Sequence, residues 1–200
     1  MENSKKPERQ IKILIGLPCV GKSTYIKEHA EEFKDYTIIS IDMIAEERSK
    51  GTGFTMEQVH NREYDSIVKE FNIRLNNAVK EGKNILIEGM NLTSEKRSAR
   101  ISIAKASKQY NYMSTAIIIY PPEEQRHVAR LLQRSAKEHR SGAINTINIL
   151  RMEPIRDGEF DHIEYIGTPP EKALFHNYNE SVNLREIIQN AKSEMAGLYR

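Results

Sequence analysis

A short apolar strand followed by a glycine-rich turn constrains this chain more than any other feature of its sequence. The run Ile11–Ile15 is mostly β-branched and apolar, as expected of a buried parallel strand. It leads directly into Gly16-x-x-x-x-Gly21-Lys22-Ser23. Glycines in this pattern let the backbone turn tightly and aim its N–H groups at phosphate oxygens. The lysine can reach the outer phosphates, and the serine hydroxyl can meet Mg²⁺.

The segment after this loop supports the same interpretation. Residues 23–33 are compatible with a helix, because Tyr25, Ile26, Ala30 and Phe33 can share one face. The positive end of such a helix points at the same anion. The sequence therefore predicts a nucleotide-binding loop. The residues assigned to the nucleotide are Gly16, Leu17, Pro18, Cys19, Val20, Gly21, Lys22, Ser23 and Thr24.

The size and composition of the chain fit one α/β domain. It has 200 residues, of which 38% are hydrophobic and 29% charged, with a formal net charge of +2. This balance does not by itself indicate a nucleic-acid binder. The single cysteine, Cys19, excludes an internal disulfide and a cysteine metal cluster. Because no apolar run approaches ~18 residues and residues 1–10 are polar, we expect a cytoplasmic protein without a membrane span or secretory signal.

Apolar runs alternate with helical patterns along the chain. The predicted strands are 11–15, 36–41, 84–88, 113–120 and 162–166. The predicted helices are 23–33, 55–80, 94–109, 123–138 and 183–196, with Thr55 and Gln58 in capping-box spacing at the second of them. This alternation predicts a doubly wound, mostly parallel sheet with flanking helices and with ligands at the carboxyl ends of the strands. We divide the chain into a polar tail (1–10), a domain (11–166) and an extension (167–200) whose helix packs on that domain.

A carboxylate is expected opposite the phosphate loop, at the end of the second strand. Ser40-Ile41-Asp42 lies there in the sequence. An aspartate at this place could orient an acceptor hydroxyl and take its proton during phosphoryl transfer. Aspartate is also a good helix cap, so Asp42 could instead cap a helix that begins at Met43. The two roles are compatible, and the sequence leaves both open.

A second acid ends the third predicted strand. Ile85-Leu86-Ile87-Glu88 is apolar until its last residue, similar to strands whose terminal acid holds Mg²⁺ or its waters. Glutamate is less usual than aspartate in this role. A solvated carboxylate at a strand end is the alternative.

A basic stretch follows the fourth strand. Arg126, Arg130 and Arg134 are four residues apart and share a helical face, and Arg140 continues the basic stretch. Arginine offers a planar fork of donors that can clamp a migrating phosphoryl group. A solvated surface helix is the alternative. The histidine within this stretch, His127, is expected on the surface.

Together these pieces resemble the phage-type polynucleotide 5′-hydroxyl kinases and their P-loop kinase relatives. The resemblance covers about residues 11–166. Its elements, in chain order, are the loop at 16–24, Asp42, the Glu88–Leu92 turn with Arg97 behind it, Arg134 and Arg140, Ile149–Pro154, and Glu159-Phe160-Asp161. The resemblance implies an α/β P-loop NTPase fold with an arginine-bearing helical lid, and ATP and Mg²⁺ as ligands. The catalytic residues that it implies are Lys22, Asp42, Arg134 and Arg140, and the metal residues are Ser23 and Glu88.

The acceptor side departs from the family pattern. The phage enzymes carry an arginine three residues after the catalytic aspartate, used on the nucleic-acid side. In this chain that position is Ala45, and the nearest arginine is Arg48. Met90 occupies a place that is often threonine. We assign Arg48, Asn91 and Arg97 to acceptor binding.

The sequence thus predicts an ATP-dependent kinase that phosphorylates a hydroxyl group. The acceptor expected first is nucleic acid, either a 5′-hydroxyl end or a hydroxymethyl group on a modified DNA base. A small-molecule kinase acting on a nucleoside, sugar or other metabolite is the alternative. A nucleotide-hydrolysing switch or toxin-like module is a further alternative. An aspartate at position 42 is not typical of a simple switch, which uses a glutamine or another water-orienting group. The sequence leaves the oligomeric state open.

Overall fold

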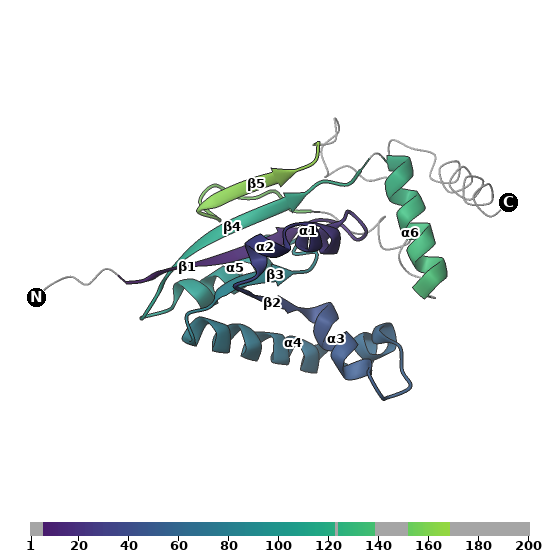
Figure 1. The fold of residues 1–200 in the computed structure, drawn as a ribbon, viewed down its shortest axis with the longest axis horizontal. Coiled ribbons are helices and arrows are strands. Elements are labelled where there is room, and N and C mark those ends of the chain that lie inside the picture. Colours follow the sequence, from purple (N-terminus) through teal and green to yellow (C-terminus); the bar gives the residue numbers. More distant parts are fainter. Residues whose placement is uncertain (1–5, 123, 139–151, 169–200) are drawn as a thin grey trace, which may run out of the picture.

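The computed structural model describes residues 6–122, 124–138 and 152–168, and these residues contain a five-stranded, all-parallel sheet (Figure 1). Its strands are β1 (Glu8–Ile15), β2 (Tyr36–Ser40), β3 (Asn84–Glu88), β4 (Asn111–Ile119) and β5 (His162–Ile166). They lie in the order β2-β3-β1-β4-β5. The predicted parallel, doubly wound sheet is therefore confirmed.

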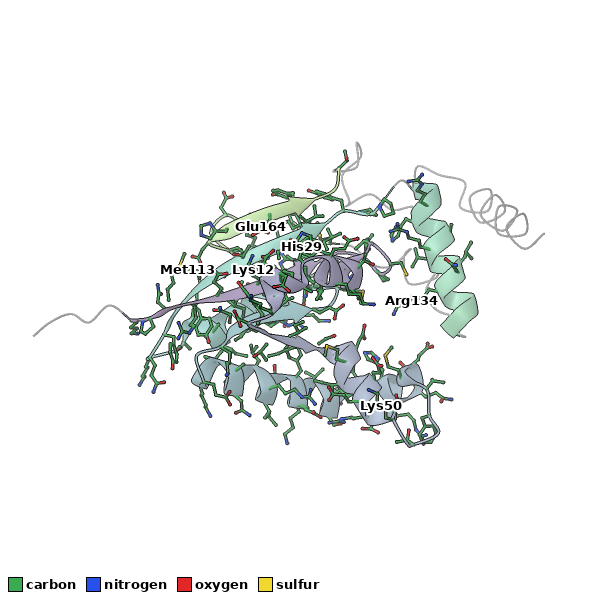
Figure 2. The ribbon with its side chains drawn as sticks, in the orientation of Figure 1. Lys12, His29, Lys50, Met113, Arg134 and Glu164 are labelled. Atoms are coloured by element: carbon green, nitrogen blue, oxygen red, sulfur yellow. The ribbon has the colours of Figure 1, made fainter. Side chains whose placement is uncertain are left out.

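The central strand β1 is hydrogen-bonded to a neighbouring strand on each side. Ile13 pairs with Ile87 of β3 and with Ala116 of β4, and all three side chains are fully buried. Lys12 is the polar exception in this strand. Its ammonium pairs with Glu32 at 2.7 Å and with Glu164 at 3.5 Å, which compensates its burial (Figure 2).

Helices cover both faces of the sheet. They are α1 (Lys22–Glu28), α2 (Ala30–Phe33), α3 (Ile41–Ser49), α4 (Met56–Lys80), α5 (Ser94–Lys105) and α6 (Glu124–Glu138). Helix α2 contributes the partner of Lys12 on one face, while α4 and α5 pack against β1 to β4. Helix α6 stands beyond the carboxyl ends of the strands, next to the loop that leads into α1 (Figure 1).

Several element boundaries differ from the sequence-based expectation. Strand β1 begins at Glu8, so Glu8–Gln10 belong to the sheet and not to the polar tail; they pair with Asn111–Met113 of β4. The predicted helix at 23–33 is two helices, because His29 has φ −108° and ψ 30° and interrupts the α-helical backbone. The predicted capping box is confirmed: Thr55 and Gln58 bond reciprocally at the start of α4.

The bounds of α5, β2 and β4 also differ from the expectation. Helix α5 ends at Lys105, not at residue 109. The predicted helix at 183–196, Arg140 and Ile149–Arg151 lie outside the described residues. No helix in the described part of the chain is long and apolar enough to cross a membrane.

The strand order determines where the functional site lies. Strand β1 is followed in the chain by β2, on one side of the sheet, while β4 lies on its other side. The connections after β1 and β4 therefore leave the sheet in different directions and open a crevice at the carboxyl ends of the strands. The phosphate loop follows β1, Asp42 follows β2 and Glu88 is the last residue of β3, so all three lie at this edge of the sheet.

Candidate active site

The phosphate loop joins β1 to α1 and requires glycine at both of its ends. A Cβ at Gly16 would lie 2.7 Å from the Ile119 carbonyl oxygen, closer than real Cβ contacts allow. Gly21 has φ +111°, in the left-handed region that favours glycine. Gly21 also provides no side-chain cap to α1, which leaves the N–H groups of its first turn available to an anion.

Lys22 lies over this loop at the start of α1. Its Nζ donates to the carbonyl oxygens of Gly16 at 2.9 Å and Leu17 at 2.7 Å. Burial lowers the pKa of Lys22 to about 8, although the carboxylates of Glu88 and Asp42 act in the opposite direction. A phosphate group at this place would favour the charged lysine and raise its pKa.

Ser23 and Glu88 bring a hydroxyl and a carboxylate together at the start of α1. The Ser23 hydroxyl donates to Glu88 Oε1 at 2.6 Å. A hydroxyl and a carboxylate are hard oxygen ligands, and Mg²⁺ commonly takes its other ligands from water and substrate phosphates. Among the described residues no group of three histidine, cysteine or acidic side chains could hold a metal ion. The Ser23 hydroxyl and the Glu88 carboxylate have the ligand chemistry that Mg²⁺ prefers.

Asp42 lies in the first turn of α3, and the cap of this helix is a different residue. Helix α3 begins at Ile41, and the Ser40 side chain accepts from the Met43 N–H at 3.5 Å. The alternative that Asp42 caps a helix starting at Met43 is therefore wrong. The exposed Asp42 carboxylate is close enough to Lys22 to influence its pKa. It is thus available on the site side of α3.

Helix α6 approaches the phosphate loop with two side chains. His127 is fully buried, and its Nε2–H donates to the Pro18 carbonyl oxygen at 2.7 Å. Burial lowers the pKa of His127, which favours the neutral ring. Arg134 lies on the side of α6 that faces the loop, with Nη1 4.0 Å from Cys19 Sγ (Figure 2). The expectation of a surface His127 is wrong, and its spacing of four residues from buried Leu131 was the available signal.

The turn after β3 is fixed to the phosphate loop by two hydrogen bonds. The Gly16 N–H donates to the Met90 carbonyl oxygen at 3.1 Å, and Asn91 Nδ2 donates to the Leu14 carbonyl oxygen at 2.6 Å. Asn91 has φ +50° and is 96% buried. Its amide thus supports the loop from behind, in a place different from the acceptor contact expected from the sequence.

Arg97 also serves the fold, contrary to the expectation that it binds the acceptor. Its side chain is completely buried, and its guanidinium pairs with Glu159 at 2.5 Å. The other acceptors of its N–H groups are the carbonyl oxygens of Asn91, Leu92 and Pro154. These bonds use all five guanidinium donors, so none remains for a ligand.

Arg48 is held in a similar way between α3 and α4. It pairs with Glu63 at 2.8 Å and Glu70 at 2.5 Å and donates to Ser66. Its guanidinium is thus neutralised by two carboxylates on α4. The expectation that Arg48 contacts the acceptor is corrected accordingly.

Two adjoining cavities open around these residues. The larger, of about 770 Å³, is lined by the phosphate loop, Lys22, Gly89, Arg130 and Arg134. The smaller, of about 460 Å³, we call the α3–α4 cavity. Its lining residues are Ser23, Asp42, Met43, Glu46, Thr55, Met56, Glu57, Glu88 and Arg134. Both cavities are lined by Ser23, Asp42, Met56, Glu57, Glu88 and Arg134. Asp42 and Arg134 therefore lie where the two cavities meet, while Lys22 lines the larger one.

The sheet order, the loop after its central strand and the lysine over that loop define a P-loop NTPase of the kinase-like type. A family model described as an AAA domain matches residues 11–153, and the chain belongs to this AAA domain family. No curated protein matches the chain at a significant level.

Solved structures share this fold at low sequence identity. A protein from Chloroflexus aurantiacus J-10-fl provisionally described as a kinase is 17% identical, with a TM-score of 0.58, over 96% of this chain and 98% of that one. A structure of the PezAT toxin–antitoxin system of Streptococcus pneumoniae is 16% identical, with a TM-score of 0.60, over 98% and 90%. A fungal RNA kinase is 16% identical, with a TM-score of 0.52, over 92% and 83%.

Proposed function

We propose that this protein is an ATP-dependent kinase that transfers the γ-phosphoryl group of ATP to a hydroxyl group. The observation that carries the proposal is the junction of the two cavities. Arg134 and Asp42 lie at this junction, and Lys22 adds positive charge from the wall of the larger cavity. A nucleotide in the larger cavity and an acceptor in the α3–α4 cavity would then meet at these residues.

The proposed reaction is a single displacement. The acceptor oxygen attacks the γ-phosphorus, a new P–O bond forms, and the bond to the β–γ bridging oxygen breaks to release ADP. Asp42 takes the proton of the hydroxyl. Lys22 and Arg134 stabilise the charge on the phosphoryl oxygens during transfer. Ser23 and Glu88 would hold Mg²⁺, which supplies further charge neutralisation when bound.

Two classes of acceptor are compatible with this reaction. A nucleic-acid hydroxyl follows from the resemblance to polynucleotide kinases. A small-molecule hydroxyl is favoured by the ion pairs of the two arginines that were expected to contact nucleic acid. Arg48 pairs with Glu63 and Glu70, and Arg97 pairs with Glu159. A polynucleotide needs cations for its phosphates. The small-molecule acceptor is therefore our preferred candidate.

A transfer screen with γ-labelled ATP tests the proposal. The acceptors are 5′-hydroxyl DNA and RNA, hydroxymethylated DNA, nucleosides, sugars and amino sugars. We expect a labelled product with at least one hydroxyl acceptor, and its loss by about 10²-fold or more in Lys22→Ala. Steady hydrolysis of ATP with no labelled acceptor would instead support the nucleotide-hydrolysing switch and overturn the kinase assignment.

A further inference from the structure

The α3–α4 cavity contains two carboxylates that the proposed reaction does not use. Glu46 lies one helical turn after Asp42 on α3, on the same face, and Glu57 lies in the first turn of α4. Both line the cavity beside Asp42 and Glu88; Glu46 is exposed, and the half-buried Glu57 also lines the larger cavity. Within the described residues, neither Glu46 nor Glu57 forms an ion pair.

Other acidic residues of α3 and α4 do form ion pairs. Glu47 pairs with Arg74 at 2.6 Å, and Glu63 and Glu70 pair with Arg48. These pairs link α3 to α4 outside the cavity. The acids that link the two helices are thus neutralised by arginine, whereas Glu46 and Glu57 have no ion-pair partner among the described residues.

The arrangement is not that of a metal site. As noted above, the described acidic, histidine and cysteine side chains form no group of three that could hold one metal ion. The carboxylates are instead spread around a space of about 460 Å³, within the size range of small-molecule sites. Met43 and Met56 add apolar wall to the same space. Such a cavity suits an organic ligand with a carbon skeleton.

The charge of the cavity restricts which ligand can enter. Among its described lining residues four are carboxylates and one, Arg134, is cationic. A bound nucleotide would add further negative charge next to it. An acceptor that carries phosphate would be repelled by both, whereas a cation would be attracted. Like-charge repulsion of this kind gives specificity against the wrong partner.

We propose that the α3–α4 cavity selects a small, positively charged hydroxyl compound, an amino sugar or amino alcohol, as the phosphoryl acceptor. Its ammonium group lies between Glu46 and Glu57, and its hydroxyl group lies at Asp42. The inference rests on the proposed kinase function for the transfer step. Its binding step can be measured separately.

The first experiment measures transfer from ATP to matched acceptors. Each amino sugar or amino alcohol is compared with its neutral deaminated analogue, its phosphorylated analogue and a 5′-hydroxyl oligonucleotide. We expect kcat/KM to be about tenfold or more higher for the cation than for its neutral analogue. Glu46→Gln and Glu57→Gln should each remove most of this preference through KM. Glu31→Gln is the control, since this 94% exposed carboxylate lies on α2, outside both cavities.

The second experiment measures binding of the same compounds by calorimetry, with a non-hydrolysable ATP analogue present. We expect the cations to bind more tightly than their neutral analogues, and less tightly as salt is raised. Equal binding of cation and neutral analogue, or a preference that both glutamine variants retain, would overturn the inference. Selective transfer to a neutral or anionic acceptor would also overturn it while leaving the kinase function intact. Charge-selective binding without transfer to any acceptor would support the inference and contradict the kinase function.

Discussion

The Ser23 hydroxyl donates a 2.6 Å hydrogen bond to Glu88 Oε1 and so joins the start of α1 to the end of β3. These residues are 65 positions apart in the sequence. The fold brings them together because β3 pairs directly with β1, so their carboxyl ends lie at one edge of the sheet. A hydroxyl and a carboxylate thus meet outside the carboxyl ends of the strands, where open α/β sheets bind their ligands.

The first prediction concerns the dependence of transfer on Mg²⁺. Ser23→Ala and Glu88→Gln each remove one of the oxygen groups proposed to position the ion. We expect the Mg²⁺ concentration for half-maximal transfer to rise by about 10- to 100-fold in either variant. Titration of activity with Mg²⁺ measures this, with Glu31→Gln as the control. An unchanged titration in both variants would contradict the assignment.

The second prediction separates catalysis from capping at the start of α3. Because Ser40 is the cap, Asp42→Asn removes a carboxylate while the cap remains. We expect transfer to fall by about 10²-fold or more, with ATP affinity retained and stability changed by less than about 1 kcal/mol. Ser40→Ala is the matched control and should lose about 1 kcal/mol of stability. Near-normal transfer in Asp42→Asn would place the base elsewhere, with Glu88 the next candidate.

The third prediction concerns Arg134 on α6. Arg134→Ala and Arg134→Lys should lower kcat by about 10-fold or more, with a smaller change in ATP affinity, because lysine keeps the charge but loses the planar fork. Arg126→Ala is the control, since Arg126 is an exposed arginine of the same helix. The same fall remains predicted for Arg140→Ala. Full kcat in the Arg134 variants would mean that the arginines of α6 take no part in the transfer step.

The sequence was a good guide wherever a local pattern carries its own geometry. The phosphate loop is recognisable because the glycine positions and the lysine spacing are short-range requirements, and β3 was predicted at its observed bounds, Asn84–Glu88. The start of β1 was missed because Glu8–Gln10, at the amino end of this central strand, are polar and exposed or half-exposed. Their strand conformation depends on pairing with β4, which no local pattern reveals.

The errors at the site have the same origin. Arginine is a residue type that often binds substrates, but Arg97 instead pairs with Glu159, which is 62 positions away. Arg48 is likewise decided by Glu63 and Glu70 on the next helix. Whether a charged side chain is free to bind a ligand depends on which residue it pairs with. That partner is known only from the tertiary structure.

The fourth prediction follows from the burial of Arg97. Arg97→Met leaves the nearly buried Glu159 carboxylate, whose side chain is 3% exposed, without its cation. We expect a loss of about 3–5 kcal/mol in the free energy of unfolding, measured by urea titration. Arg74→Met, at a pair whose arginine is 39% exposed, should cost only about 0–1 kcal/mol. A double variant that also carries Glu159→Gln should recover part of the loss. Equal costs at Arg97 and Arg74 would refute the structural role.

The fifth prediction uses the lowered pKa of Lys22, which is about 8. Nucleotide phosphates favour the charged lysine, so the pKa in the complex is higher than in the free protein. Between these two pKa values, binding takes up a proton and weakens as the pH rises. We expect ATP affinity to be retained below pH 8 and to fall by up to about tenfold per pH unit above it.

Calorimetry at constant excess Mg²⁺, between pH 7 and pH 9.5 and without an acceptor, measures this dependence. Lys22→Met is the matched control, since methionine has no charge to lose. Its ATP affinity should be lower than that of the wild type and should not show the fall above pH 8. An equal slope in the two proteins would assign the titration to another group, and a flat wild-type profile would mean that the Lys22 ammonium does not meet the phosphates.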